Sequence, residues 1–233
     1  IIKAGVLPVA IEFMDALCIK TTEEFAQAGY PDCQALLIVE IEGSEAEIDD
    51  QLGRIKEIAM RHDPVEFRES KSAAESAAIW LGRKSAFGAM GQISDYMCLD
   101  GTIPVSELPM VLRRIGELSE QFGLPVGNVF HAGDGNMHPL ILFDANKPGD
   151  LELCEEMGAE ILKLCVDAGG CLTGEHGVGI EKRDLMTSQY APADLEAQLL
   201  VKDVFDPNWL LNAAKVFPLA VSQNRRETQL AAE

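Results

Sequence analysis

Two short glycine-rich segments hold three of the four histidines in this 233-residue chain. The first runs from His131 to His138 and contains the pair Asp134-Gly135, which is typical of a two-residue hairpin turn. If that pair forms the turn, His131 lies directly opposite His138 on one face, with Cβ atoms about 5 Å apart. Two imidazoles in this arrangement can bind one metal ion. The alternative is a pair of cross-strand histidines that bind water or backbone groups.

The second segment, Gly174 to Gly179, contains the pair Glu175-His176. Three glycines in six residues favour an irregular backbone that can approach another group closely. Glu175 could then complete a metal site of two histidines and one carboxylate, with a position left open for a substrate. His176 would be free to act as a base near neutral pH. An ordinary glycine turn is the alternative, and the spacing does not fit the dinucleotide-binding motif G-x-G-x-x-G.

The segments around these residues alternate between the patterns of strands and helices. Helices are predicted after the capping box of Ser44 and Glu47 and at 73–82, 106–122, 150–168 and 194–205. Apolar runs predict strands at 34–42, 64–67, 96–99, 126–131 and 137–143. We therefore expect an α+β fold: an antiparallel sheet with helices packed on one face in ferredoxin-like units, followed by a C-terminal helical segment. The polar end, 222–233, is expected to fray.

Charge and composition exclude several classes of function. The chain has 38 acidic and 19 basic residues, a formal charge of −19, which repels nucleic acid and anionic lipid. An anionic substrate would need local positive charge, to which Lys182 and Arg183 could contribute, although such residues are usually solvated. There is no apolar run long enough to predict a membrane span. The six cysteines form no C-x-x-C pair, so we expect reduced thiols in a cytoplasmic protein.

Three stretches carry a resemblance to a known family. The sequences GNVFHAGDGNMHP, CLTGEHGVGIEK and FDPNWLLN-AAK-VFP are similar to the C-terminal domain of FAD-linked oxidases of the vanillyl-alcohol-oxidase type. Within that family the chain most resembles the branch that contains the D subunits of bacterial glycolate oxidases and the D-lactate dehydrogenases. The resemblance runs from about Ala4 to Pro218, and the stretch WLGRKSAFGAMGQIS is part of it.

This resemblance implies that a 2-hydroxy acid, such as glycolate or D-lactate, is oxidised to a 2-oxo acid while FAD accepts a hydride. It also implies a divalent metal (Zn, Mn or Fe), a base, a group for the substrate carboxylate and residues near the flavin. In this chain the resemblance assigns the metal to His131, His138 and Glu175, and the role of the base to His176. It assigns the substrate carboxylate to Arg83 and the positions near the flavin to Asn212 and Lys215.

Two departures from the family pattern affect these expectations. Ala213-Ala214 replaces the usual Pro-Gly after Asn212, which puts the local turn and the flavin contact in doubt. Cys98 stands where enzymes for 2-hydroxyglutarate have a lysine for the distal carboxylate. That difference favours a small monocarboxylate as substrate.

We expect residues 1–218 to form the domain for substrate and metal and residues 219–233 to be a polar tail. The resemblance implies that the flavin is bound mainly by an N-terminal FAD domain and that this portion alone is inactive. Because the chain opens at Ile1 within an apolar segment, we expect it to be part of a longer polypeptide. Flavin and iron–sulfur subunits are the implied partners, with peripheral attachment to the inner membrane through them. A metal hydrolase and a non-catalytic assembly module are the competing hypotheses.

Overall fold

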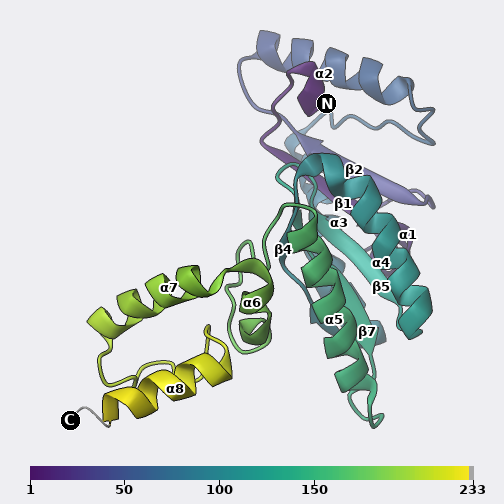
Figure 1. The fold of residues 1–233 in the computed structure, drawn as a ribbon. Helices are drawn as coiled ribbons and strands as arrows, with labels where there is room; N and C mark the ends of the chain where they lie inside the picture. The colour runs from purple at the N-terminus through teal and green to yellow at the C-terminus, as the bar shows by residue number, and fades with distance from the viewer. Residues whose placement is uncertain (231–233) are drawn as a thin grey trace.

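A single antiparallel sheet organises the chain in this computed structural model, which describes residues 1–230 (Figure 1). Within that range the sheet has seven strands: β1 (Ala10–Asp15), β2 (Ala35–Glu40), β3 (Asp95–Cys98), β4 (Gly101–Thr102), β5 (Val126–His131), β6 (Asn136–Met137) and β7 (Pro139–Phe143). Their order is β2-β1-β5-β6-β4, and β7 pairs with both β5 and β3. Strand β5 is therefore the centre of the sheet.

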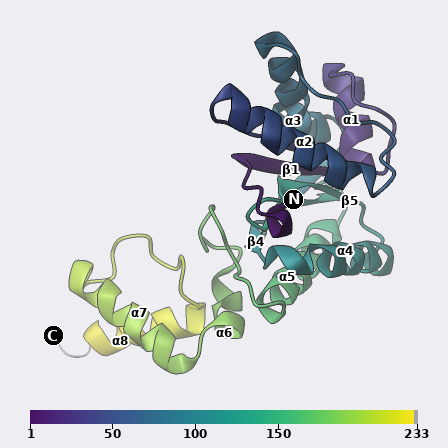
Figure 2. The same ribbon diagram turned by 90° about the horizontal axis from the view of Figure 1, so that it is seen from above.

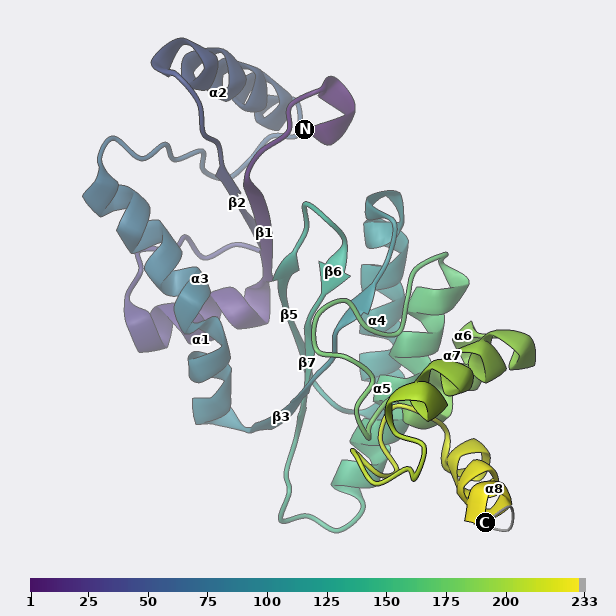
Figure 3. The same cartoon turned by 90° about the vertical axis from the view of Figure 1, so that its left-hand side faces the viewer.

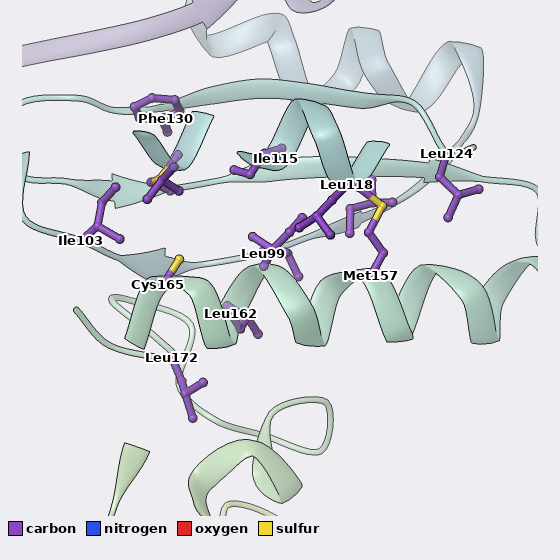
Figure 4. Close-up of a cluster of buried hydrophobic side chains, with 14 of the residues drawn as sticks. Leu99, Ile103, Ile115, Leu118, Leu124, Phe130, Met157, Leu162, Cys165 and Leu172 are labelled. Atoms are coloured by element: carbon purple, nitrogen blue, oxygen red, sulfur yellow. The ribbon is translucent and has the colours of Figure 1, made fainter. Parts of the chain in front are cut away.

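Helices cover both faces of this sheet. On one face, Val129 of β5 belongs to an apolar cluster with residues of α1 (Ala16–Ala26) and α3 (Ala73–Ile93). On the other face, Phe130 packs with residues of α4 (Leu108–Phe122) and α5 (Asp150–Asp167), as Figure 4 shows. Figure 3 shows α1 and α3 on one side of the strands and α4 and α5 on the other.

The predicted α+β class, the antiparallel sheet and the C-terminal helical segment are confirmed. The helices, however, form two layers where the sequence predicted one. The reason is that β5 and β7 are buried along most of their length, so that side chains on both faces need an apolar cover.

Other boundaries differ from the expected ones. Strand β1 and helix α1 form where no element was predicted, and 64–67 lies outside any strand. Helix α3 continues to Ile93, well past the predicted end at Gly82. Helix α2 (Glu45–Met60) begins as predicted, because Ser44 and Glu47 form the capping box.

The C-terminal helices stand beside the sheet as a separate group (Figures 1 and 2). This group contains α6 (Met186–Gln189), α7 (Pro192–Phe205) and α8 (Leu219–Leu230). Arg225 joins α8 to α7 through ion pairs with Asp203 and Glu196. The polar end that was expected to fray is thus helical as far as Leu230, and residues 231–233 lie outside the described part. Within residues 1–230, none of the helices combines the length and apolar character that crossing a bilayer requires.

A close backbone contact fixes the start of the second glycine-rich segment. Cys171 pairs with Thr102 of β4 through two backbone hydrogen bonds of 3.0 and 3.1 Å. Gly170 precedes this bridge, and a Cβ atom added to it would lie 1.7 Å from the Thr102 carbonyl oxygen. Only glycine fits there without moving the backbone.

We therefore expect Gly170→Ala to lower the free energy of unfolding by about 2 kcal/mol, through overpacking against the Thr102 backbone. Gly116→Ala is the control, because Gly116 is exposed within α4 and has open space around it. That variant should gain about 0.5–1 kcal/mol, since alanine favours helices. Urea denaturation measures both changes, and equal stability of the two variants would contradict the close contact.

Candidate metal and substrate site

The hairpin that links β5 to β6 and β7 brings His131 and His138 to the same face of the sheet. His131 pairs with Asn136, and the same register continues to Asn128 opposite Pro139. The loop thus contains four residues, 132–135. The prediction of a two-residue turn at Asp134-Gly135, with His131 directly opposite His138, is wrong by two positions. A type I′ turn needs positive φ at both central residues, and of this pair only Gly135 has it (φ 81°).

The error of two positions leaves the predicted convergence intact. Because side chains alternate along a strand, His138 points to the same face as Asn136 and is a diagonal neighbour of His131. The two imidazole centroids are 5.3 Å apart. Glu175 Oε1 lies 3.6 Å from His131 Nε2, and one ligand atom from each of the three residues falls within 4.8 Å of the others. The structure therefore brings together the three predicted metal ligands.

Each of the two histidines is held through its Nδ1 atom. His138 Nδ1 lies 3.1 Å from the Leu99 carbonyl oxygen, and His131 Nδ1 lies 2.8 Å from Glu12 Oε1. A carbonyl can only accept, so His138 carries a proton on Nδ1 and its Nε2 lone pair is available to a ligand. Burial lowers the pKa of His138, which favours this neutral form. Such outer hydrogen bonds are typical of metal-binding histidines.

Glu12 connects His131 to Arg83. Glu12 and Arg83 are buried, with 5% and 7% of the residue surface exposed. Arg83 donates through Nε and Nη2 to Glu12 Oε2, each at 2.9 Å. The Arg83 guanidinium also lies 5.9 Å from the ring centroid of Phe87, and Phe87 is next to His138. Arg83, expected to bind the substrate carboxylate, is thus beside the histidines but already engaged by a carboxylate of the protein.

Glu12 was not predicted as a site residue from the sequence. It lies in an apolar strand, AIEFMD, and points to the same face as the histidines because Glu12 pairs with His131 in the sheet. An acidic residue within such a run is rarely buried without a partner. A single acidic residue within an apolar stretch was therefore the signal that could have identified Glu12. It was not used, because β1 was not predicted to be a strand.

A buried carboxylate, Asp100, fixes the loop that carries Glu175 and His176. Asp100 has no exposed surface. It accepts hydrogen bonds of 2.5–3.2 Å from five donors: the Thr173 hydroxyl, Lys182 Nζ, and the backbone N–H groups of Gly174, Glu175 and His176. Burial alone would raise the pKa of Asp100, but these donors outweigh it and hold the pKa well below its usual range. The loop therefore wraps around a permanent negative charge.

The Asp100 carboxylate and its donors form an anchor for the loop. Lys182 belongs to this anchor through its ion pair with Asp100, and it is only 3% exposed. The expectation that it is a solvated cation is wrong, because the Asp100 carboxylate compensates its charge inside the protein. Asp100 itself was not singled out from the sequence. Its only signal was an acidic residue next to glycine at the end of the apolar run YMCL.

His176 reaches the site from this loop. Its ring stacks on that of His138, with the centroids 5.3 Å apart and the planes inclined by 20°. The His176 side chain is exposed, as expected of a base that must reach a substrate. Cys98 completes a second group: one potential ligand atom each from Cys98, His138 and His176 lies within 4.8 Å of the others. Burial raises the pKa of the Cys98 thiol to about 12, and the nearby Asp100 adds to this increase.

The two residues assigned to the flavin, Asn212 and Lys215, are exposed on the loop that follows α7. Ala214, at the position of the family's glycine, has a left-handed backbone with φ 59°. The loop is tied to the glycine-rich segment by the Val216 N–H, which donates to the Gly179 carbonyl at 2.8 Å. Lys215 and Asn212 are therefore on a segment joined to the one that contains His176.

We expect Asp100→Asn to lower the free energy of unfolding by about 3 kcal/mol, because it leaves the buried Lys182 cation without a counter-charge and weakens the loop anchor. Asp49→Asn, an exposed substitution on α2, should change stability by no more than about 0.5 kcal/mol. Urea denaturation of the two variants tests this. A cost for Asp100→Asn as small as that of the control would mean that the anchor contributes little.

The chain matches one family model over residues 1–216, described as FAD linked oxidases, C-terminal domain. Among curated proteins it is 47% identical to glycolate oxidase subunit GlcD of Escherichia coli (strain K12), over 94% of this chain and 44% of that protein. It is 30% identical to glycolate oxidase subunit GlcD of Bacillus subtilis (strain 168), over 93% and 47%. A probable mitochondrial D-lactate dehydrogenase of Danio rerio is 27% identical, over 94% and 44%. The chain thus spans less than half the length of these relatives.

Solved structures agree on the fold. A crystal structure of p-cresol methylhydroxylase with substrate bound superposes with a TM-score of 0.64 at 14% identity, covering 93% of this chain and 48% of that one. A 4-ethylphenol oxidase from Gulosibacter chungangensis gives 0.61 at 13% identity, covering 91% and 48%. At such low identity these likenesses concern the fold alone.

Proposed function

Since this chain belongs to the family of FAD linked oxidase C-terminal domains, we propose that it is the substrate-binding and metal-binding part of an FAD-dependent 2-hydroxy-acid dehydrogenase. The names of its relatives, glycolate oxidase subunits and D-lactate dehydrogenases, support glycolate or D-lactate as the substrate. The observation that carries the proposal is the convergence of His131, His138 and Glu175, with both imidazoles held through Nδ1.

The donor set fits a divalent cation. His131, His138 and Glu175 would hold Zn²⁺, Mn²⁺ or Fe²⁺, because nitrogen and oxygen ligands suit all three ions. Glu12 and Leu99 fix the two rings so that Nε2 is the available atom on each. When bound, the cation would lower the pKa of the substrate's 2-hydroxyl group. Glu175 is exposed, which is consistent with a site open to substrate.

His176 is the proposed base. Its exposed imidazole, next to His138, would accept the 2-hydroxyl proton as hydride leaves the adjacent carbon. FAD would accept that hydride, so that the 2-hydroxy acid becomes a 2-oxo acid. Asp100 would serve this step by holding the His176 backbone N–H at 2.9 Å, which limits where the ring can lie.

Arg83 is the proposed anchor for the substrate carboxylate. A guanidinium has five N–H donors, and Glu12 takes two of them, so donors remain for a second carboxylate. Glu12 would then fix the orientation of both Arg83 and His131. Asn212 and Lys215, exposed on their loop, would face the flavin that the rest of the polypeptide binds.

We also propose the extent of this domain, the size of its substrate and its partners. Residues 1–218 would form the substrate and metal domain, inactive without its own FAD domain, and 219–233 would follow it as a tail. Cys98, in place of a lysine, favours a small monocarboxylate. The glycolate oxidase relatives are named as subunits, which supports a partner subunit, and we propose flavin and iron–sulfur subunits in that role. A cytoplasmic enzyme attached peripherally to the inner membrane through them is consistent with these proposals.

His131→Ala should remove the metal, whereas His176→Ala should keep it and lose activity. In the full-length protein we expect kcat for glycolate or D-lactate, with a dye acceptor, to fall about 10²–10⁴-fold in His176→Ala because the base is gone. After loading with Mn²⁺, the manganese content measured by elemental analysis should drop in His131→Ala but not in His176→Ala.

The control for this pair is His62→Ala, which changes the exposed fourth histidine and should leave both readouts unchanged. Full activity of His131→Ala after a chelator would contradict the metal role and favour an assembly module. Metal-dependent cleavage of esters or amides by this chain alone would instead support a hydrolase, for which a site of two histidines and a carboxylate is equally suited.

Glu12→Gln should weaken metal binding by about tenfold or more, because the amide has only one oxygen and, with that oxygen facing Arg83, its NH2 group faces His131 Nδ1–H and cannot accept from it. The change keeps the size of the side chain and one oxygen for Arg83. Competition with a metal-sensitive chelator measures the affinity, and Glu24→Gln, an exposed substitution on α1, serves as the control. Equal affinity of Glu12→Gln and wild type would show that Glu12 serves Arg83 alone.

A further inference from the structure

Cys98 is a diagonal neighbour of His138 on the sheet. Strands β3 and β7 pair so that Cys98 lies opposite Leu140. Leu140 follows His138 by two residues along the chain. Because side chains alternate with a period of two, Cys98, Leu140 and His138 point to one face. His176 arrives at this face from the loop that Asp100 anchors, and its ring stacks on His138. Thus a thiol and two imidazoles lie within 4.8 Å of one another.

We propose that Cys98, His138 and His176 form a second metal site, which overlaps the first and takes a thiophilic divalent cation, Zn²⁺ or Cd²⁺. Zinc accepts sulfur and nitrogen ligands together, whereas Mn²⁺ prefers carboxylate, imidazole and water. On binding, the thiol proton passes to solvent and a metal–sulfur bond forms, without any change of oxidation state. The first group, with its two histidines and Glu175, contains no sulfur and also suits Zn²⁺, so the Cys98 thiolate decides which site a thiophilic ion takes, whereas Mn²⁺ binds only in the first.

The two sites cannot be occupied together. His138 belongs to both, and its Nδ1 atom donates to the Leu99 carbonyl, which leaves Nε2 as its one available nitrogen. An ion bound by Cys98 and His138 therefore displaces an ion bound by His131 and His138. Because His176 is a ligand of the ion in the second site, its imidazole is then no longer free to accept a proton.

The identity of the ion then decides whether the base is free. This consequence rests on the proposed function, in which His176 accepts the hydroxyl proton. A manganese-type ion in the first site leaves His176 available to the substrate. Zinc or cadmium in the second site blocks His176 and inhibits the enzyme. The geometry thus assigns Cys98 a role in selecting the metal.

Zinc X-ray absorption on the full-length holoenzyme, loaded with one equivalent of Zn²⁺, tests the site directly. Sulfur at about 2.3 Å is distinguished from nitrogen or oxygen at about 2.0–2.1 Å. The wild type and Cys33→Ser, a control at a half-buried cysteine in the loop before β2, should both show one sulfur ligand. Cys98→Ser and Cys98→Ala should show none. A wild-type spectrum with nitrogen and oxygen alone, or sulfur that persists in both Cys98 variants, overturns the proposal.

Inhibition of the manganese-loaded holoenzyme is the second readout. Adding Zn²⁺ should inhibit the wild type at concentrations about tenfold or more below those that inhibit Cys98→Ser, since a ligand is lost. Equal sensitivity overturns the inhibitory role. The two proposals fail separately: a sulfur ligand in an enzyme that oxidises no 2-hydroxy acid overturns the proposed function alone, while an active enzyme without a sulfur ligand overturns the second site alone.

Discussion

The Asp100 carboxylate determines where the second glycine-rich loop can lie. It is fully buried, yet its hydrogen bonds to the loop and its contact with Lys182 keep it charged. Without these contacts, Glu175 and His176 would sit on an irregular segment with nothing to direct them toward the hairpin. The segment contributes little apolar surface of its own, so its position depends on this polar anchor. The sheet places two histidines, and the anchor brings the carboxylate and the third histidine to them.

The sequence predicted the proposed metal ligands and the base better than it predicted the residues that hold them in place. The turn was misplaced by two residues, but the convergence of His131 and His138 survived, because a shift of two keeps every side chain on its face. A shift of one would have separated them. The supports Glu12 and Asp100 were missed because each acts only once distant strands or loops meet. No local pattern records that β1 will pair with β5, or that a loop more than 70 residues away will fold around Asp100.

The fold was predicted to a similar degree. Long periodic segments such as α4 and α5 were recognised, since their apolar spacing is strong and local. The second helical layer was not, because the apolar runs of β5 and β7 indicate burial but not which helices provide it. Strand β1 was not predicted, because its apolar residues do not alternate clearly with polar ones. It pairs with β5 and carries Glu12, so this one omission also hid the contact that orients both His131 and Arg83.

The proposed chemistry requires one cation held by His131, His138 and Glu175, while His131 Nδ1 stays hydrogen-bonded to Glu12 and His138 Nδ1 to the Leu99 carbonyl. Anomalous diffraction from crystals of the manganese-loaded full-length enzyme tests this most directly. We predict one strong peak within about 2.3 Å of both Nε2 atoms and a Glu175 oxygen. A peak elsewhere, or these three side chains turned away from an ion in a fully loaded and active enzyme, would contradict it.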